Sequence, residues 1–564
     1  MLDAFTHETL TAYFSMEMAL LNDIPTYSGG LGILAGDTMR SAADLELPMV
    51  AVTLASRSGY FKQTIDNGGQ QVEQSVSWDP ADWAVPLNAK VAVDIEGHPV
   101  WICGWLYILK GHVNGQQPII LLDTDLDENN EDDRKITHHL YGDGTNYRLK
   151  QEIVLGIGGV RLLQALGFTI ARYHMNEGHS ALLVLELLRR YAYQPEEVRA
   201  GESPYDIPLV RELCCFTTHT PIEAGHDRFG YDLVQQILGE FIDLASLKHF
   251  AGGNDLNMTY LALNASEYVN GVAIRHAETS RKMFPGYHVH AITNGVHPFT
   301  WTADSFISLY DKHLPGWCHE PDLLVRVEHN ISDDAIWDAH SLAKSALIDR
   351  VKSLCDKTFS PDLPILGFAR RMTAYKRPDL LFADLEKLKE IASKYPFQIV
   401  LAGKAHPKDR EGKQLIQTLH SHIHDLADVI PIAFLPDYDM ELASKLVSGS
   451  DVWLNTPLPP MEASGTSGMK AAFNGVPSLS VLDGWWVEGC IEGVTGWSVD
   501  EESGSVGNND VENLYAKLKQ VVLPLYYEDR TGWIKVMKGA ISINASFFNS
   551  HRMMRRYATE AYLR

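Results

Sequence analysis

Short apolar runs alternate along this sequence with longer amphipathic segments, and the alternation predicts an α/β protein. Apolar runs typical of buried strands lie in the first half at 10–14, 49–55, 169–180 and 214–221. A second series lies at 364–369, 397–407, 429–436, 451–457 and 476–482. Segments with helical periodicity separate the runs, for example 147–167. Strands that alternate with helices predict parallel, doubly wound sheets.

The chain is too long for one ordinary hydrophobic core, so its 564 residues predict two large domains. Residues 289–301 indicate a strand and an Asn-Gly turn, after which connecting helices lead to the second series. We therefore expect a first α/β domain at 1–295 and a second at 296–540. Residues 541–564 predict a helix that crosses back to the first domain. Residues 56–146 are less regular, and their polar clusters predict loops over a substrate face.

The composition of the chain disfavours several classes of function, such as nucleic-acid binding and membrane insertion. The net charge of −24 disfavours a nucleic-acid partner or an anionic membrane surface, so an anionic ligand would need a locally basic pocket. No apolar run approaches a bilayer span, and the first ten residues do not resemble a signal peptide. The six cysteines form no C-x-x-C pair, which predicts reduced thiols in a cytoplasmic protein and no metal site.

Basic residues gather directly after the predicted strand at 364–369. Arg370 and Arg371 follow the strand, and Lys376 and Arg377 come five positions later. Such a run can be an ordinary solvated surface. Here it follows a buried strand in an acidic chain, which favours a phosphate-binding site.

Two glycine-rich turns lie between an apolar run and the start of a helix. One is SGGLG at 28–32, and the other is ASGTSG at 463–468, just before Lys470. Backbone N–H groups in such turns can bind an anion, although neither turn has the G-x-G-x-x-G pattern of dinucleotide sites. Lys470 can be a phosphate ligand, a Schiff-base amine with a pKa lowered by burial, or an ordinary helix lysine.

Two predicted strands in the first half end in polar residues. One ends at Asn176-Glu177-Gly178-His179 and the other at His219. The carboxyl ends of parallel strands face the ligand crevice of an α/β sheet, where imidazole suits hydroxyl recognition and proton transfer. Each histidine could instead be a structural, hydrogen-bonded one. Neither has the H-E-x-x-H spacing of a zinc site.

The segment EASGTSGMK at 462–470 resembles the pyridoxal-phosphate lysine segment of the α-glucan phosphorylases, the glycogen, starch and maltodextrin phosphorylase family. The likeness covers nearly the whole chain and is greatest to the shorter bacterial members, through the words YFSME, YSGGLG, NEGH, FTTHTP, TNGVH and DGWWVE. It implies a fold of two Rossmann-like domains facing a central cleft, the GT-B glycosyltransferase type. It also implies a catalytic core without the N-terminal control extension of the animal enzymes.

The resemblance implies a role for each matching residue, with Lys470 forming the Schiff base of pyridoxal 5′-phosphate. The residues implied to act in catalysis are Lys470, Arg371, Lys376, His219 and Gly30. Those implied to hold the cofactor are Lys470, Thr466, Ser467, Gly468, Arg370, Tyr375, Tyr438 and Gly29. Those implied to bind substrate are Glu462, Ala463, Ser464, Gly465, Asn294, His219, Leu31, Glu177 and His179. The animal enzymes differ at Asp439 and Gly468, where they have arginine and asparagine.

The implied reaction is reversible transfer of a terminal α-1,4-linked glucosyl unit to inorganic phosphate, giving α-glucose 1-phosphate with retained configuration. The implied partners are an α-1,4-glucan or maltooligosaccharide and phosphate, and a homodimer is left open. One alternative is a nucleotide-sugar-dependent α-glucan synthase of the same fold, which would have glutamate at the position of Lys470. Another is an inactive glucan-binding homologue, which would have lost catalytic groups that this sequence retains.

Overall fold

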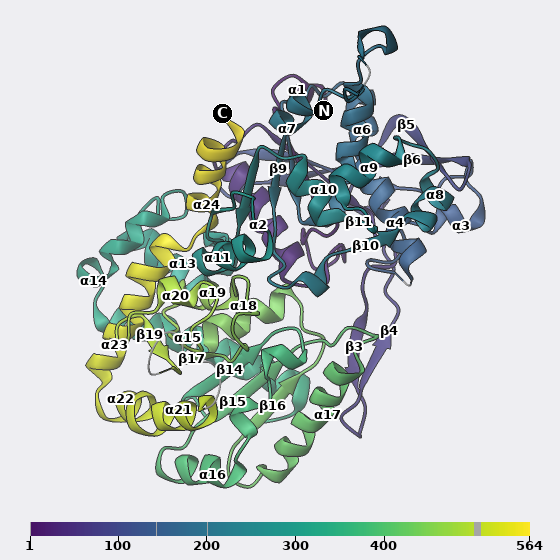
Figure 1. The fold of residues 1–564 in the computed structure, drawn as a ribbon. Helices are drawn as coiled ribbons and strands as arrows, with labels where there is room; N and C mark the ends of the chain where they lie inside the picture. Colours follow the sequence, from purple (N-terminus) through teal and green to yellow (C-terminus); the bar gives the residue numbers. More distant parts are fainter. Residues whose placement is uncertain (1, 143, 200, 501–508, 564) are drawn as a thin grey trace.

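Two large sheets organise the protein (Figure 1). The computed structural model describes residues 2–142, 144–199, 201–500 and 509–563. The first sheet has nine strands in the order β13-β12-β9-β8-β1-β2-β7-β6-β5, and the second has six in the order β16-β15-β14-β17-β18-β19. The chain passes from the first sheet to the second once, between β13 and β14. The predicted α/β fold class is confirmed.

The first sheet is parallel except at one edge. Its strands are β1 (Thr11–Phe14), β2 (Met49–Leu54), β5 (Val85–Ile95), β6 (His98–Lys110), β7 (Gln116–Asp123), β8 (Arg172–Asn176), β9 (Cys214–Thr217), β12 (Tyr268–Gly271) and β13 (His290–Ala291). Neighbours from β13 to β7 are parallel, and β6 and β5 continue the sheet in antiparallel fashion. Strands β1 and β2 are buried at every residue, as expected for strands covered on both faces.

The segment 56–146 is more regular than its sequence suggested. Strands β5 and β6 lie within it, and buried and partly exposed residues alternate along most of β6. That alternation suits an antiparallel edge with one face towards solvent, and polar clusters in the adjoining loops obscured it. The same segment contains a small hairpin, β3 (Lys62–Ile65) with β4 (Gln71–Gln74), which reaches the second half of the molecule beside α17 (Arg410–Asp425) (Figure 1).

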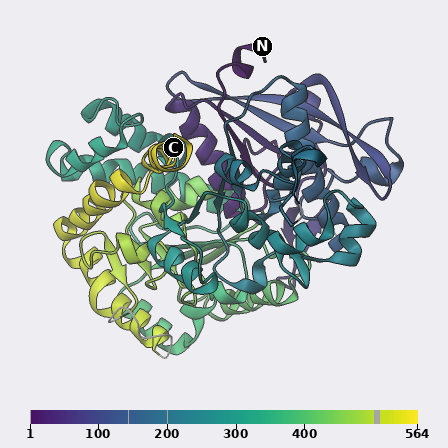
Figure 2. The same ribbon diagram turned by 45° about the horizontal axis from the view of Figure 1, so that its top comes forward.

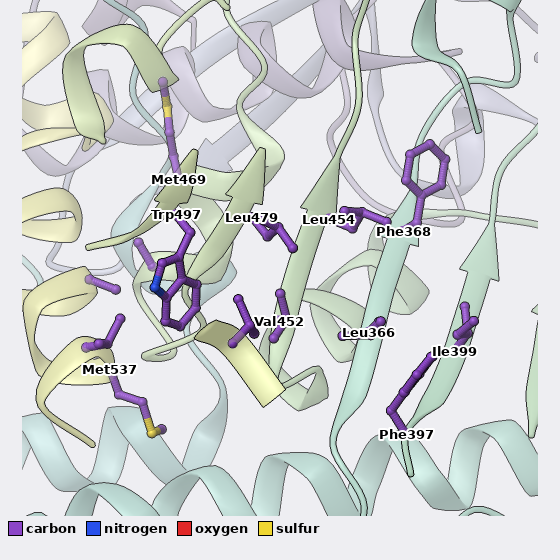
Figure 3. Packing of buried hydrophobic residues seen from close by; sticks show 14 of the residues in the cluster. Leu366, Phe368, Phe397, Ile399, Val452, Leu454, Met469, Leu479, Trp497 and Met537 are labelled. Carbon is purple, nitrogen blue, oxygen red and sulfur yellow. The ribbon is translucent and has the colours of Figure 1, made fainter. Parts of the chain in front are cut away.

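The second sheet is parallel throughout. Its strands are β14 (Ile365–Ala369), β15 (Gln398–Ala402), β16 (Ile432–Leu435), β17 (Val452–Asn455), β18 (Ser478–Ser480) and β19 (Gly496–Ser498). Leucines from neighbouring strands, such as Leu366, Leu454 and Leu479, form a buried layer against Trp497 and Met537 (Figure 3). The apolar runs of the second half predicted five of these strands, whereas β19 is too short and polar to have been recognised.

Helices cover both sheets. Those around the first sheet include α2 (Gly30–Asp44), α4 (Thr145–Ile153), α5 (Gly159–Ala165), α6 (Leu183–Arg190), α7 (Ile207–Leu213), α8 (Tyr231–Leu238), α9 (Leu244–Ala251), α10 (Met258–Asn264) and α11 (Ile274–Met283). Later ones include α12 (Pro298–Trp301), α13 (Asp304–His313), α15 (Asp333–Cys355), α16 (Leu385–Lys394), α18 (Met440–Gly449), α19 (Ser467–Ala472), α21 (Asp510–Lys517), α22 (Leu523–Glu528), α23 (Arg530–Gly539) and α24 (Ser550–Tyr557). None of the helices in the described ranges is long and apolar enough to cross a bilayer.

Polar side chains set several helix starts. The Ser332 hydroxyl accepts from the Ala335 N–H at the start of α15, and the Asp439 carboxylate accepts from the Leu442 N–H at the start of α18. Asp439 is one of the positions where the resemblance drawn from the sequence implies arginine in the animal enzymes. Here the aspartate serves as a helix cap, for which arginine has no suitable acceptor.

The end of the chain returns to the first sheet. Helix α24 contacts α2, and Figures 1 and 2 show this yellow segment leaving the second half and running to the purple part of the molecule. The backbone joins there as well, because the Val296 N–H donates to the Phe548 carbonyl and the Ser550 N–H donates to the Val296 carbonyl. The last helix therefore holds the connection between the two halves from outside.

Candidate active site

The polar residues at the strand ends of the first sheet meet in one hydrogen-bonded group. Strands β8 and β9 are in register with Asn176 opposite Thr217, which brings the residues after them together. His219 Nε2 lies 2.6 Å from Asn176 Oδ1, and the His219 backbone N–H donates to a Glu177 carboxylate oxygen at 2.7 Å. The same oxygen accepts from the Thr220 hydroxyl. The register of β8 and β9 therefore brings Asn176, Glu177 and His219 together.

Burial sets the charge of this group. It lowers the pKa of His219 to about 3, so the imidazole is neutral at physiological pH. With Asn176 Oδ1 accepting from Nε2–H, the Nδ1 lone pair remains available to accept from a hydroxyl. Burial also raises the pKa of Glu177, whose backbone has a left-handed φ of 71°. A buried, strained residue at a strand end is typical of functional sites.

The basic run of the second half surrounds one buried glutamate. Arg370 follows β14 and donates to Asn455, the last residue of the adjacent β17. A single oxygen of Glu462 accepts from Arg370 at 2.5 Å and from Lys376 at 2.7 Å. Although burial disfavours its charge, the two cations lower the pKa of Glu462 to about 2. Burial and Arg370 lower the pKa of Lys376 to about 8 against the opposing effect of Glu462.

Arg371 points instead to the first half. A methyl group added to Gly29, the residue before α2, would lie 2.8 Å from an Arg371 guanidinium nitrogen. The next residue, Gly30, is exposed at the start of the 15-residue helix α2. No carboxylate in the described ranges lies within the 4 Å of an ion pair to Arg371. A cation and a helix N-terminus thus face each other across the two halves, which suits an anion.

Lys470 lies on α19, and its side chain is buried against Trp301. Its Nζ is 3.6 Å from the centre of the Trp301 ring, and the Trp301 indole donates to Asp37 on α2 of the first half. Among the described residues, no carboxylate lies within 4 Å of Nζ. Burial lowers the pKa of Lys470 to about 8. An amine that loses its proton near neutral pH is a better nucleophile than an exposed lysine.

The glycine-rich turn before Lys470 is held by the DGWW segment. The Glu462 N–H donates to Asp483, and the Trp485 N–H donates to the Ser464 carbonyl. Gly465 has a φ of 82°, a value that favours glycine, and a methyl group on Gly468 would lie 2.7 Å from the Trp485 ring. These close approaches explain the small residues of the turn.

The remaining predicted residues occupy varied places around these groups. Ser467 accepts a hydrogen bond from the Trp453 indole, and Thr466 precedes the first residue of α19. Tyr375 and Tyr438 both interact electrostatically with Arg370. Leu31 follows Gly30 on α2, and Ala463 lies in the glycine-rich turn. The structure thus places these side chains on the two halves that face each other.

His179 lies in a different environment from His219. Its Nε2 is 3.4 Å from Asp227, which also accepts from Arg148 at 2.9 Å. Burial lowers the pKa of His179 to about 3. His179 therefore belongs to a buried charged cluster on the first half, and it forms no hydrogen bond with His219 in the described ranges.

Sequence reasoning missed Glu17. Its carboxylate accepts from the backbone N–H of Ser28 at 2.5 Å and of Gly29 at 3.2 Å, and from the Tyr141 hydroxyl at 2.9 Å. Asn176 is linked to it through Ser15, whose hydroxyl donates to the Glu17 carbonyl. A charged residue inside the apolar stretch YFSMEMALL was the available signal. Glu17 connects the phosphate-type turn with the His219 group.

Several buried polar atoms near these groups lack a protein partner. Asn294 Oδ1, Ser464 Oγ and Arg370 Nε have no hydrogen bond within the part of the chain that the structure describes. Buried polar groups are normally satisfied, so such atoms mark positions where a polar ligand fits. A buried amine without an ion pair among the described residues, the cation Arg371 and close-packed glycines also suit a phosphorylated aldehyde cofactor.

Comparison with known proteins supports a family assignment. The family model described as "Carbohydrate phosphorylase" matches residues 240–495. The chain is 38% identical to a protein named maltodextrin phosphorylase from Thermococcus litoralis, over 98% of this chain and 70% of that protein. It is 34% identical to a glycogen phosphorylase from Aquifex aeolicus, over 99% and 86%. An uncharacterized protein of Methanocaldococcus jannaschii is 31% identical over 98% of this chain and 99% of its own length.

Proposed function

Because this chain belongs to the carbohydrate phosphorylase family, whose fold is of the GT-B type, we propose that it is an α-glucan phosphorylase that uses pyridoxal 5′-phosphate. The reaction is reversible phosphorolysis of terminal α-1,4-linked glucosyl units of glucans or maltodextrins. Its product is α-glucose 1-phosphate with retained configuration. The glucan and phosphate side lies in the domain at 1–295 and the cofactor side in the domain at 296–540.

The observation that carries the proposal is the state of Lys470. The amine is buried, unpaired within the described ranges, and has a pKa lowered to about 8. Such a lysine at the end of a glycine-rich turn suits covalent attachment of a cofactor aldehyde better than it suits a structural role. In this assignment Thr466, Ser467 and Gly468, with Arg370, Tyr375 and Tyr438, hold the rest of the cofactor.

Phosphate has a separate set of ligands. Arg371 and Lys376 bind the reacting phosphate, Gly29 and Gly30 lie against the phosphates at the start of α2, and the Gly30 N–H donates to the substrate phosphate. Glu462 favours the charged form of Lys376, because its own pKa of about 2 leaves it ionised near neutral pH. Two phosphates in one cleft need this concentration of cations, which explains a basic site inside an acidic protein.

Sugar hydroxyls are assigned to the polar atoms that lack protein partners. Asn294 Oδ1 and Ser464 Oγ offer hydrogen bonds, and neutral His219 offers its Nδ1 lone pair. Glu462, Ala463 and Gly465 line the same turn, and Leu31 adjoins Gly30. Glu177 and His179 lie on the acceptor side. The neutral imidazoles of His219 and His179 suit sugar binding, because a glucosyl unit carries no charge.

The chemistry needs no pair of enzyme carboxylates. Substrate phosphate gives a proton to the departing glycosidic oxygen as the C–O bond breaks, and a phosphate oxygen then bonds to the anomeric carbon from the same face. The bound cofactor would supply its phosphate as a proton donor or charge stabiliser beside the substrate phosphate. The cations around Glu462 and the start of α2 hold the negative charge through the transition state. The proposal includes a cytoplasmic location, with which six unpaired cysteines agree.

The test measures whether the cofactor becomes covalently attached to Lys470. Purified protein is incubated with pyridoxal 5′-phosphate, reduced with borohydride and mapped by peptide mass spectrometry, and glucose 1-phosphate formation from maltodextrin and phosphate is measured in parallel. We expect the adduct on Lys470 and phosphorolysis dependent on the cofactor. Lys470→Ala should lose both, because it removes the only amine assigned to the cofactor.

Two control variants complete this experiment. Lys470→Arg keeps a cation but cannot form the covalent bond, so it should also lose the adduct and the activity. Lys535→Ala removes an exposed lysine on α23 and should change neither. An unmodified Lys470 in the wild-type protein, or full activity in Lys470→Ala, would overturn the proposal and favour a nucleotide-sugar synthase or a glucan-binding role.

A further inference from the structure

A buried cluster behind the cleft joins three segments that are distant in the sequence. Asp44 ends α2, His297 precedes α12, and His551 lies in the first turn of α24. Asp44 Oδ2 is 2.8 Å from His297 Nε2 and 3.6 Å from His551 Nε2. The ligand atoms of all three residues lie within 4.8 Å of one another, and the three side chains are buried.

Hydrogen bonding within the protein does not satisfy this cluster. His551 Nε2 is buried and has no hydrogen-bond partner in the described ranges. Its distance to Asp44 is too long for a hydrogen bond. Besides His297, one further imidazole among the described residues lies near His551. This is His319, whose ring centre is 6.4 Å from that of His551. An unpartnered nitrogen thus points into a group that already contains a carboxylate and a second imidazole.

The surroundings orient the two imidazoles towards Asp44. His551 Nδ1 lies 2.9 Å from the Ser41 hydroxyl, which can accept from Nδ1–H and so leaves the Nε2 lone pair free to bind an ion. His297 Nδ1 lies 2.7 Å from the Thr300 hydroxyl and accepts from the Thr300 backbone N–H at 3.2 Å, so its Nε2 carries the proton shared with Asp44 until an ion binds. The other Asp44 oxygen is fixed by the backbone N–H groups of His112 and Val113.

The distances suit a small divalent ion. Bonds of about 2.0–2.1 Å in a tetrahedral arrangement separate neighbouring ligand atoms by roughly 3.3 Å. The two measured separations to Asp44, 2.8 and 3.6 Å, lie on either side of this value. Two imidazoles and a carboxylate are ligands that zinc and its neighbours in the first transition series prefer, whereas calcium and magnesium prefer oxygen alone.

We propose that Asp44, His297 and His551 form a structural binding site for a divalent transition metal of the zinc type. The ion takes the place of the proton on His297 Nε2, which moves to Nδ1 and is donated to the Thr300 hydroxyl, and it gives His551 Nε2 the partner that the described residues do not provide. It ties α2, the segment leading to Trp301, and α24 to one point. Since α2 begins at Gly30 and Trp301 underlies Lys470, the metal stabilises the relative position of the two halves.

The test uses full-length protein without an affinity tag, because tags bind metals. The protein is dialysed against a chelator and titrated with Zn²⁺ or Co²⁺, and bound metal is counted by elemental analysis. We expect about one tightly bound metal per chain, a ligand-field absorption band with Co²⁺, and a rise in melting temperature on adding Zn²⁺. His551→Gln and Asp44→Asn should lose the bound metal, the absorption band and the rise in melting temperature.

Two further variants keep the test decisive if the ligand variants fold poorly. Ser41→Ala removes only the hydroxyl behind His551 and should weaken binding about 10- to 100-fold. His340→Gln alters another buried histidine, which bonds Asp451 at 3.0 Å, and should bind metal like the wild type. The proposal is wrong if wild-type protein binds no metal in either titration. It is also wrong if folded His551→Gln and Ser41→Ala bind as tightly as the wild type.

Discussion

At the scale of single residues, burial has opposite consequences for two groups of the site. Glu462 and Lys470 are both buried. Glu462 contacts two cations, which overcome burial and keep it ionised with a pKa near 2. Lys470 has no such partner among the described residues, so burial lowers its pKa to about 8. The difference in partners makes one residue a permanent counter-charge and the other a potential nucleophile.

The pKa of Lys470 predicts how cofactor attachment depends on pH. Only the neutral amine reacts with an aldehyde, and its fraction rises with pH until the pKa is passed. We expect the rate of borohydride-trapped labelling at Lys470 to rise between pH 6 and about 8 and then to level off. Rates are measured by quantitative peptide mapping of the cofactor-free protein.

A short lysine-containing peptide added to the same reaction is the control. Labelling of its side-chain amine should keep rising towards pH 10, because a lysine in a model peptide has a pKa of about 10.4. A Lys470 profile that follows the peptide profile above pH 9 would contradict a lowered pKa.

At the scale of elements, the β3–β4 hairpin fastens the first half to the second. Gln71 donates to the Ala405 carbonyl and accepts from the Ala405 N–H, both at 2.9 Å. Gln63 forms two hydrogen bonds with Asp437. The Gln63 backbone N–H donates to the Asp437 carboxylate, and the Asp437 N–H donates to the Gln63 side-chain oxygen. Two buried glutamines of the hairpin thus form paired hydrogen bonds with the loops that follow β15 and β16. Hydrogen bonds of this type specify position more than they add stability.

Gln71→Ala should weaken this attachment. The substitution leaves the Ala405 N–H and carbonyl without partners in a buried site, so we expect the free energy of unfolding to fall by about 1–3 kcal/mol. Chemical denaturation monitored by tryptophan fluorescence measures the change. We also expect the KM for phosphate to rise, because the halves that bring Arg371 to Gly29 would be held less firmly.

Gln70→Ala is the matched control for this prediction. Gln70 is exposed in the same hairpin, and its side chain makes no hydrogen bond within the described ranges, so its removal should change stability by less than about 0.5 kcal/mol. Equal effects of the two substitutions would refute the role assigned to Gln71.

At the scale of the whole molecule, α24 positions part of the candidate sugar site. Arg552 donates to the backbone carbonyls of Thr293 and Asn294 at 2.6 and 2.9 Å. Burial and the charge of Arg556 lower the pKa of Arg552 to about 10, which still leaves it charged at neutral pH. A residue near the end of the chain therefore holds the segment that carries Asn294. The C-terminal helix is part of the site's scaffold.

Arg552→Met should affect both stability and substrate binding. Methionine fills similar space but satisfies neither carbonyl, so we expect a loss of about 1.5–3 kcal/mol in the free energy of unfolding. If Asn294 binds a sugar hydroxyl, the KM for maltodextrin should rise more than the KM for phosphate. Denaturation and steady-state kinetics with each substrate varied in turn separate the two effects.

Arg556→Met tests whether position on α24 alone matters. Arg556 pairs with Glu560 one turn later and is partly exposed, and such pairs contribute at most about 0.5 kcal/mol. This variant should behave like the wild type. A larger loss in Arg556→Met than in Arg552→Met would contradict the proposed contact between α24 and the Asn294 segment.

The sequence by itself determined the family, the α/β class and most parallel strands. Apolar runs such as 364–369 and 397–407 are continuous because parallel strands are buried on both faces, so their signal is local. The glycine-rich turns and the basic run could also be located, since turn chemistry and charge are visible in short segments. The antiparallel β5 and β6 were missed because polar clusters in the adjoining loops obscured the alternation of buried and partly exposed residues along them.

Only the tertiary structure decided which of these residues meet. It paired Arg370 and Lys376 with Glu462, turned Arg371 towards Gly29, and buried Lys470 against Trp301. It also brought together Asp44, His297 and His551, which lie hundreds of positions apart. No local pattern contains this information, because contacts between distant segments depend on how the two sheets and the returning C-terminal helix pack. Burial, which sets the pKa values of the site, follows from that same packing.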